Sequence, residues 1–333
     1  IKRGSEMRGK ADPGINYAKK VFLGLNIYIL TMVLIQIFYV ITAAVFIVLS
    51  PDLNFLIDGD MAVGLISLAA TLIGLLAAGI YFCDIDKRYG LFEAIDYAAV
   101  SAGHKDSFFK RLSVKTECMK VRDLICLMAA VISAQILAVA ADIPIEALLN
   151  SIGYTSELSP AATADYTLNW ALVIYSVIWG PVIEEIVFRG FVLRGLLPYG
   201  KKKAVIISAL AFSLMHGDIS QLVFTFMAGL ILARAALKYS LGWAVILHVF
   251  NNGVLGTLLP LAAESMPEDV FVWAYMAVAA VCLVIAFLYL REISGKGKHA
   301  EYKMPVFKDL INIWFIVFLG WEILETALSV SPL

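Results

Sequence analysis

Three short stretches of the sequence place ionisable or amide side chains in apolar surroundings. They are PVIEEIVFRG (181–190), FSLMHG (212–217) and LHVFNN (247–252). Together they supply Glu184, Glu185, Arg189, His216, His248 and Asn252. A carboxyl group with imidazoles suits acid–base chemistry or a proton path. Because a charged side chain at the centre of a bilayer costs about 2.5–3.5 kcal/mol, such residues indicate function and face the interior of a helix bundle.

Helical geometry separates the two glutamates. Residues four apart share a face, so Glu185 and Arg189 can form an ion pair along one side of a helix. Glu184 is turned about 100° away from Glu185 at 3.6 residues per turn. The pair is therefore interpreted as structural support, and Glu184 as the carboxyl group kept for another role.

The same spacing rule orients the histidines. His248 and Asn252 share one face, and Phe212 lies one turn before His216. Counted at 1.5 Å per residue from the inner ends of the segments, His248 lies about 12 Å deep, His216 about 20 Å and Glu184 about 15–20 Å. A lone intramembrane histidine is more often a helix–helix contact than a catalyst. A common site is favoured because Glu184, two histidines and an asparagine lie at similar depth.

The composition is that of a polytopic, all-α membrane protein. Of the 333 residues, 61% are hydrophobic and 16% are charged, and the mean hydropathy is +0.85. Soluble domains average about 25% charged residues. The formal net charge of −1 argues against nucleic acid as a partner.

About eight or nine membrane spans are expected, since each needs about 20 apolar residues. Nine candidates are present: 21–49, 61–82, 123–141, 169–194, 203–217, 219–237, 240–259, 270–290 and 307–329. Lys and Arg are absent from the loops 51–60, 142–168, 218–220 and 260–269. The positive-inside rule then places the N-terminus in the cytoplasm. The site is expected in the middle to cytoplasmic half of the bilayer.

Three segments follow from this pattern. Residues 1–168 are expected to form N-terminal membrane helices, with a polar, basic segment at 83–122 that lies on the cytoplasmic surface, either as interfacial helices or as a solvated loop. Residues 169–262 form the functional core, because the intramembrane ionisable residues gather there. Residues 263–333 are expected to form C-terminal membrane helices.

The three motifs resemble those of the CPBP family of intramembrane proteases, also called the Abi or CAAX-protease family. EEIVFR fits E-E-x-x-x-R, FSLMH fits F-x-x-x-H and HVFNN fits H-x-x-x-N, in the family's order. The family includes the type II CAAX prenyl endopeptidases and bacterial relatives linked to peptide processing and bacteriocin self-immunity. The resemblance covers about residues 170–260 and implies a glutamate-dependent intramembrane endopeptidase.

The resemblance also implies a role for each motif residue. Glu184 with His216 would polarise a water for attack on a peptide carbonyl. His248 and Asn252 would donate hydrogen bonds to the oxyanion, and Glu185, Arg189 and Phe212 would support the site. No cofactor is expected. A zinc set of Glu184, His216 and His248 stays open as an alternative, although no H-E-x-x-H motif is present.

Two other functions stay open. One is a non-proteolytic scaffold that regulates a partner membrane protein, and the other is a proton-coupled transporter, for which inverted or broken repeats would be expected. The expected partners of the protease are the lipid bilayer and a membrane-associated peptide or protein, with a CAAX-type tail or a peptide precursor as the substrate. The expected location is the bacterial cytoplasmic membrane. The sequence leaves the substrate, the requirement for prenylation and the oligomeric state open.

Overall fold

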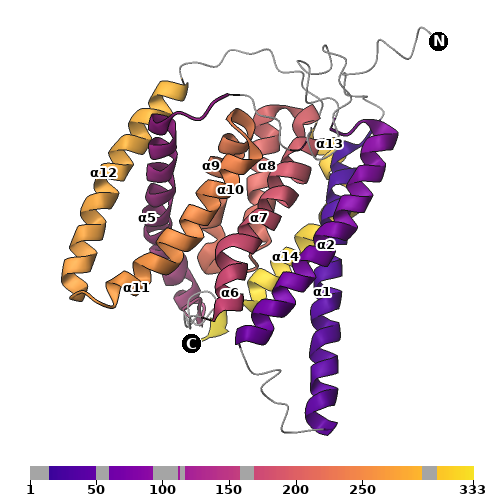
Figure 1. The fold of residues 1–333 in the computed structure, drawn as a ribbon, viewed down its shortest axis with the longest axis horizontal. Helices are drawn as coiled ribbons and strands as arrows, with labels where there is room; N and C mark the ends of the chain where they lie inside the picture. The colour runs from indigo at the N-terminus through magenta and orange to yellow at the C-terminus, as the bar shows by residue number, and fades with distance from the viewer. Residues whose placement is uncertain (1–14, 50–59, 93–111, 113–116, 158–168, 295–305) are drawn as a thin grey trace. The chain divides into compact units, whose positions relative to one another are not determined.

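The computed structural model describes residues 15–49, 60–92, 112, 117–157, 169–294 and 306–333. Most of the 83–122 segment lies outside these residues, so its expected surface position stays a prediction. The described elements are helices apart from one pair of two-residue strands (Figure 1). In that pair, β1 (Tyr154–Thr155) runs antiparallel to β2 (Ser331–Pro332). The expected all-α fold is confirmed.

The helical elements follow the apolar segments of the sequence. In chain order they are α1 (Tyr17–Leu49), α2 (Asp60–Tyr89), α5 (Val121–Ser151), α6 (Trp170–Ile174), η4 (Tyr175–Trp179), α7 (Gly180–Glu185), η5 (Ile186–Leu193), η6 (Leu197–Tyr199), α8 (Lys201–Leu214), η7 (Ile219–Gln221), α9 (Leu222–Lys238), α10 (Leu241–Val249), η8 (Phe250–Leu258), α11 (Leu259–Ala263), α12 (Glu268–Ser294), α13 (Val306–Leu310) and α14 (Ile313–Leu328). The segments η4, η5 and η8 are π-helical, and η6 and η7 are 3₁₀ turns.

Seven of the described helical segments are long and apolar enough to cross a membrane, so the chain is an integral membrane protein. They are Tyr17–Phe46, Met61–Tyr89, Val121–Ser151, Trp170–Leu193, Ile219–Lys238, Leu241–Ala263 and Glu268–Glu292. These account for seven of the nine expected spans. The segments 203–217 and 307–329 also form helices, but α8 has 14 residues and α14 has 16. At 1.5 Å per residue, both are shorter than a 30 Å hydrocarbon layer.

Local features explain why these two segments are short. After α8, Gly217 adopts a φ of +57°, a left-handed conformation that suits glycine and ends the helix. In the ninth segment, Asn312 interrupts the run between α13 and α14. Its side-chain oxygen accepts hydrogen bonds from the backbone N–H groups of Trp314 and Phe315, both at 3.1 Å. This is an N-cap, so a new helix begins there.

The chain divides into two compact units, each built from separate stretches of sequence. The first comprises Ile1–Leu112, Tyr166–Pro198 and Met304–Phe318, and the second comprises Ser113–Asp165, Tyr199–Lys303 and Leu319–Leu333. In the first unit, α1 and α2 run side by side (Figure 1). Asn26 of α1 donates to the Trp314 carbonyl at 2.7 Å, which ties the start of α14 to α1.

The helix α2 is also the main support of the segment that carries the glutamates. A Cβ added to Gly64 would lie 2.6 Å from the backbone nitrogen of Leu172, so α6 can approach α2 only because this residue is glycine. Further along, the rings of Phe82 and Phe191 stack with centroids 4.5 Å apart. The two contacts fix both ends of the segment from α6 to η5 against one helix.

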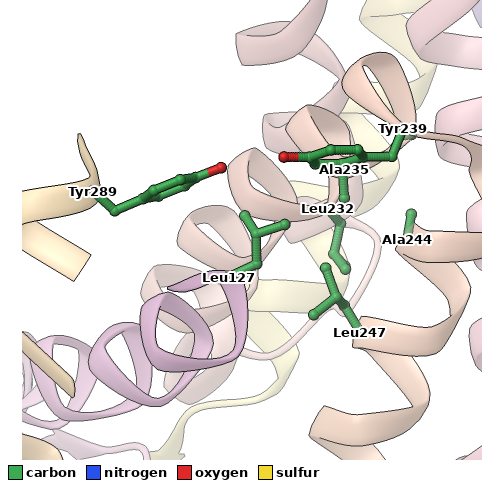
Figure 2. Close-up of a cluster of buried hydrophobic side chains, with 8 residues drawn as sticks. Leu127, Leu232, Ala235, Tyr239, Ala244, Leu247 and Tyr289 are labelled. Carbon is green, nitrogen blue, oxygen red and sulfur yellow. The ribbon is translucent and has the colours of Figure 1, made fainter. Parts of the chain in front are cut away.

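In the second unit, α5 lies beside α12, and α8 lies beside α9 (Figure 1). A buried apolar cluster joins α5, α9, α10 and α12 (Figure 2). Its members are Leu127, Leu232, Ala235, Ala236, Tyr239, Ala244, Leu247 and Tyr289. Because Leu247 is fully buried there, the cluster fixes the position of α10 directly beside His248.

Candidate active site

The first unit holds the glutamate motif on α7 and η5. Glu185 and Arg189 have side chains with 0% exposure, and the Arg189 Nη1 atom lies 2.9 Å from the Glu185 Oε1 atom. This is the ion pair that the four-residue spacing predicts. Because both charges are withdrawn from solvent, each is compensated in part by the other, and Glu184 also acts electrostatically on Arg189. The pair therefore links the end of α7 to the middle of η5 within one continuous helical segment.

Glu184 has different surroundings. Its side chain is partly exposed, whereas Glu185 is fully buried. It interacts electrostatically with the hydroxyl groups of Tyr28 and Tyr175. A Cβ added to Gly180 would lie 3.5 Å from the Glu184 Oε1 atom and 3.0 Å from the Tyr175 carbonyl oxygen. The carboxyl group thus lies near Gly180 and interacts with two tyrosines, and its partial exposure distinguishes it from Glu185.

A hydrogen bond from a tryptophan aligns the helix turn before Glu184. The indole Nε1 of Trp179 donates to the Thr71 hydroxyl of α2 at 3.1 Å. Gly180 and Pro181 then begin α7. Pro181 lies inside the continuous helical segment, just after the π-helical turn η4. The rotation of α7 is therefore set by its contact with α2, and Glu184 and Glu185 point to different surroundings as the sequence predicts.

The second unit holds both histidines. His216 does not lie within a spanning helix, which corrects the expectation that the fifth span carries it. It lies in the turn after α8, which ends at Leu214 before the left-handed Gly217. The turn is also held by the backbone N–H of Ile219, which donates to the Ser329 hydroxyl at 3.1 Å.

The chemistry of the His216 ring follows from its hydrogen bond. Its Nδ1 atom lies 2.8 Å from the Phe212 carbonyl oxygen. Since a carbonyl only accepts, Nδ1 carries the hydrogen and donates it. In the neutral ring, Nε2 then carries the lone pair, so it is the nitrogen that can accept a proton. The four-residue spacing allows this bond to a main-chain carbonyl, while the phenyl ring of Phe212 contributes separately through its ring contacts.

Phe212 contacts both histidine rings. Its ring lies edge-on to His216 with centroids 4.9 Å apart, and edge-on to His248 with centroids 5.7 Å apart. Phe212 and His248 are almost fully buried, at 2% and 5% exposure. The structure therefore brings Phe212, His216 and His248 together, with the phenyl ring as the common neighbour.

The amides of the third motif lie at a change of helix type. His248 is in the last turn of α10, whereas Asn251 and Asn252 lie in the π-helical segment η8. The Thr257 hydroxyl donates to the Asn252 carbonyl at 2.8 Å, five residues back along the chain. The spacing of a regular α-helix, which the sequence prediction assumed for His248 and Asn252, therefore changes between these two residues.

Two polar residues near this motif carry no motif signal. Gln135 of α5 and Tyr275 of α12 are joined to Asn251 through side-chain hydrogen bonds. Sequence reasoning did not select them. The available signal was the presence of an amide at position 135 within an apolar span, which the cost of burying polar groups in lipid makes informative.

A metal ion would need several donor side chains grouped together. Within either unit, over the residues that the structure describes, no group of three or more His, Cys, Asp or Glu side chains is arranged to hold a metal ion. Glu184 belongs to the first unit, and His216, His248 and Asn252 belong to the second. The zinc alternative therefore stays open, and the metal content of the purified protein would decide it.

These features define a class: a polytopic helical membrane protein in which apolar helices and the turn after α8 carry paired glutamates, two histidines and two asparagines. Comparison with known families makes this specific. Residues 166–254 match the family of Rce1-like type II CAAX prenyl endopeptidases. This segment, about a quarter of the chain, is therefore similar to an Rce1-like CAAX endopeptidase domain, a family of peptidases. No curated protein and no solved structure matches the chain.

Proposed function

We propose that the protein is an intramembrane endopeptidase that hydrolyses a peptide bond in a membrane-associated peptide or protein. The observation that carries the proposal is the extent of the family match. Residues 166–254 include the whole of all three motifs, from Glu184 to Asn252. The substrate is either a protein with a CAAX-type tail or a peptide precursor.

In the proposed reaction, Glu184 and His216 act on one water molecule. The carboxylate accepts a proton from the water, and the water oxygen bonds to the carbonyl carbon of the scissile peptide. The Nε2 atom of His216, which carries the lone pair of the ring, is the second group that can hold the water. When the tetrahedral intermediate collapses, the carbon–nitrogen bond breaks and the protonated Glu184 returns its proton to the leaving amine.

His248 and Asn252 are proposed to stabilise the oxyanion of this intermediate. Hydrogen-bond donors gain strength where bulk water is excluded, and His248 is 5% exposed. Phe212 supports the proposal because it holds both imidazole rings by edge contacts. Glu185 and Arg189 support the site by fixing the helix register rather than by contact with the substrate.

The orientation is part of the proposal. The distribution of Lys and Arg between the loops supports a cytoplasmic N-terminus. The site then opens toward the cytoplasm, in the middle to cytoplasmic half of a bacterial cytoplasmic membrane.

The experiment that tests the function compares the wild type with Glu184→Gln in liposomes. The probe is a fluorogenic peptide with a prenylated C-terminal CAAX sequence, and membrane peptides from cells expressing either form are compared by mass spectrometry. General acid–base catalysis contributes about 10²–10⁴-fold, so we expect cleavage to fall by that factor with unchanged folding. Cleavage that survives in Glu184→Gln would refute the glutamate-dependent mechanism. Unchanged regulation of a partner protein in this variant, with no peptide cleaved by either form, would support the scaffold instead.

A further inference from the structure

A chain of side-chain hydrogen bonds leads from the outer helices of the second unit to Asn252. The Tyr275 hydroxyl donates to Gln135 Oε1 at 2.8 Å. The Gln135 Nε2 atom donates to Asn251 Oδ1 at 3.2 Å. The Asn251 Nδ2 atom donates to Asn252 Oδ1 at 2.9 Å. Three elements, α12, α5 and η8, thus contribute to one connected network.

Such a network is costly to assemble in a membrane protein. Each amide that enters an apolar bundle must find a partner, because lipid offers none. The members are partly buried, and the Tyr275 ring is held parallel to Phe271 with centroids 6.1 Å apart and planes 9° apart. A phenyl or leucine side chain would fill these positions without the polar cost. The network therefore has a role beyond filling space.

That role follows from the direction of the hydrogen bonds. An amide side chain presents an acceptor oxygen on one side and a donor nitrogen on the other. Asn251 donates to the oxygen of Asn252, so the Asn252 nitrogen is directed away from Asn251. Reversing the Asn252 amide alone would place two donors against each other. The orientation of the Asn251 amide is fixed in the same way, because its oxygen accepts from the Gln135 nitrogen. The orientation of the Gln135 amide is fixed by the Tyr275 phenol, which is a better donor than acceptor and donates to the Gln135 oxygen.

An oxyanion requires a donor, so the orientation of Asn252 decides whether the residue helps or opposes catalysis. With Nδ2 toward the substrate, Asn252 donates to the developing negative charge. With Oδ1 toward the substrate, it would repel that charge. A mobile amide would sample both orientations.

We propose that Gln135, supported by Tyr275, is a positioning residue that acts through Asn251 to hold the Asn252 amide with its N–H groups toward the substrate. This inference rests on the proposed function, in which Asn252 binds the oxyanion. Gln135 does not contact the reacting atoms in this scheme. Its effect is transmitted through two hydrogen bonds.

The first test is a double-mutant cycle with the prenylated CAAX peptide as the probe. Gln135→Met keeps the length of the side chain and removes both polar atoms. Losing one oxyanion donor costs about 10²–10³-fold in kcat, and a misoriented donor should cost a part of that, about 10–100-fold, with KM unchanged. In the Asn252→Ala background, Gln135→Met should change kcat less than about twofold, because coupled residues are not additive. Equal losses in both backgrounds, or no loss in either, would overturn the proposal.

A matched control lies two residues from Gln135 on the same helix. Ser133→Ala removes a buried hydroxyl that bonds only within α5, to the Ala129 carbonyl at 2.7 Å. It tests whether any polar loss in α5 reduces kcat. We expect kcat within about twofold of the wild type, since the network to Asn252 stays intact.

The second test needs no proteolysis. Protein labelled with ¹⁵N-asparagine is studied by NMR in detergent micelles, and the Asn252 side-chain amide signals are assigned from their loss in Asn252→Ala. Gln135→Met and Tyr275→Phe should both shift these signals and speed their exchange with water. Tyr289→Phe, on the same helix as Tyr275 but in the apolar cluster, should leave them in place.

The two tests separate the inference from the proposed function. Unmoved Asn252 signals in Gln135→Met would refute the positioning role, whatever the enzyme cleaves. Shifted signals together with cleavage that survives in Glu184→Gln would refute the proposed mechanism and leave the hydrogen-bond network established.

Discussion

The buried ion pair makes the sharpest prediction, because it separates two adjacent glutamates by role. Glu185→Gln removes one charge and leaves the Arg189 guanidinium, which is 0% exposed, without its carboxylate partner at 2.9 Å. Breaking a buried pair by removing one partner costs about 3–5 kcal/mol. Glu184→Gln removes a carboxylate that is partly exposed and that acts on Arg189 less strongly than Glu185 does, so its effect on folding should be smaller.

The expected shift in melting temperature follows from the size of the chain. An unfolding entropy of about 2.1 cal/mol/K per residue gives roughly 0.7 kcal/mol/K for 333 residues. A loss of about 3–5 kcal/mol then lowers Tm by about 4–7 °C. The assay is thermal unfolding of purified variants in one detergent, followed by intrinsic fluorescence.

A third variant tests the cause of the loss. Replacing both partners, Glu185→Leu with Arg189→Met, removes the stranded charge and should be less destabilising than Glu185→Gln alone. Equal losses of Tm in Glu184→Gln and Glu185→Gln would refute the division of roles. So would a Glu185→Gln protein that keeps its Tm and loses cleavage, because Glu185 would then act in the chemistry.

Three further predictions concern the surroundings of the site. Gly180→Ala should lower both kcat and Tm, because its Cβ would lie only 3.0 Å from the Tyr175 carbonyl oxygen, so the helix backbone beside Glu184 would have to shift. Gly79→Ala, with no described atom within 4 Å, should instead stabilise its helix by about 0.5–1 kcal/mol. The reasoning fails if the two alanine variants behave alike. Phe212→Leu should reduce kcat at least about tenfold by releasing both imidazole rings, each held by about 0.5–1.5 kcal/mol, and the exposed Phe287→Leu serves as its control. An unaltered kcat in Phe212→Leu would show that the ring contacts do not contribute to catalysis. Treatment with EDTA should leave peptide cleavage intact, and activity that is lost and restored by Zn²⁺ alone would establish the zinc alternative instead.

The local parts of the site could be predicted from the sequence, since they depend only on spacing within one helix. The Glu185–Arg189 pair is such a case: both residues belong to one continuous helical segment, and a separation of four residues brings the side chains together whatever surrounds them. The bond between His216 and the Phe212 carbonyl has the same origin.

Features set by tertiary contacts could not be predicted in this way. The link from Gln135 to Asn251 depends on the register between α5 and η8. Hydrophobic patterning alone does not fix that register. It shows that Gln135 is a polar residue in an apolar span, but not which neighbouring helix supplies its partner.

The π-helical segment η8 explains why α-helical spacing does not carry through the third motif, whereas the Glu185–Arg189 pair forms at four-residue spacing although Arg189 lies in η5. The α-helical turn of α7 lies between η4 and η5, and η8 begins at Phe250, directly after the end of α10. A π-helical turn contains more residues than an α-helical turn and is rare outside functional sites. It shifts the faces of all following residues, so Asn251 meets Gln135 while its neighbour Asn252 is left to face elsewhere. A regular α-helix through this motif would rotate the two amides together, and the network from Tyr275 would then end on a different side chain.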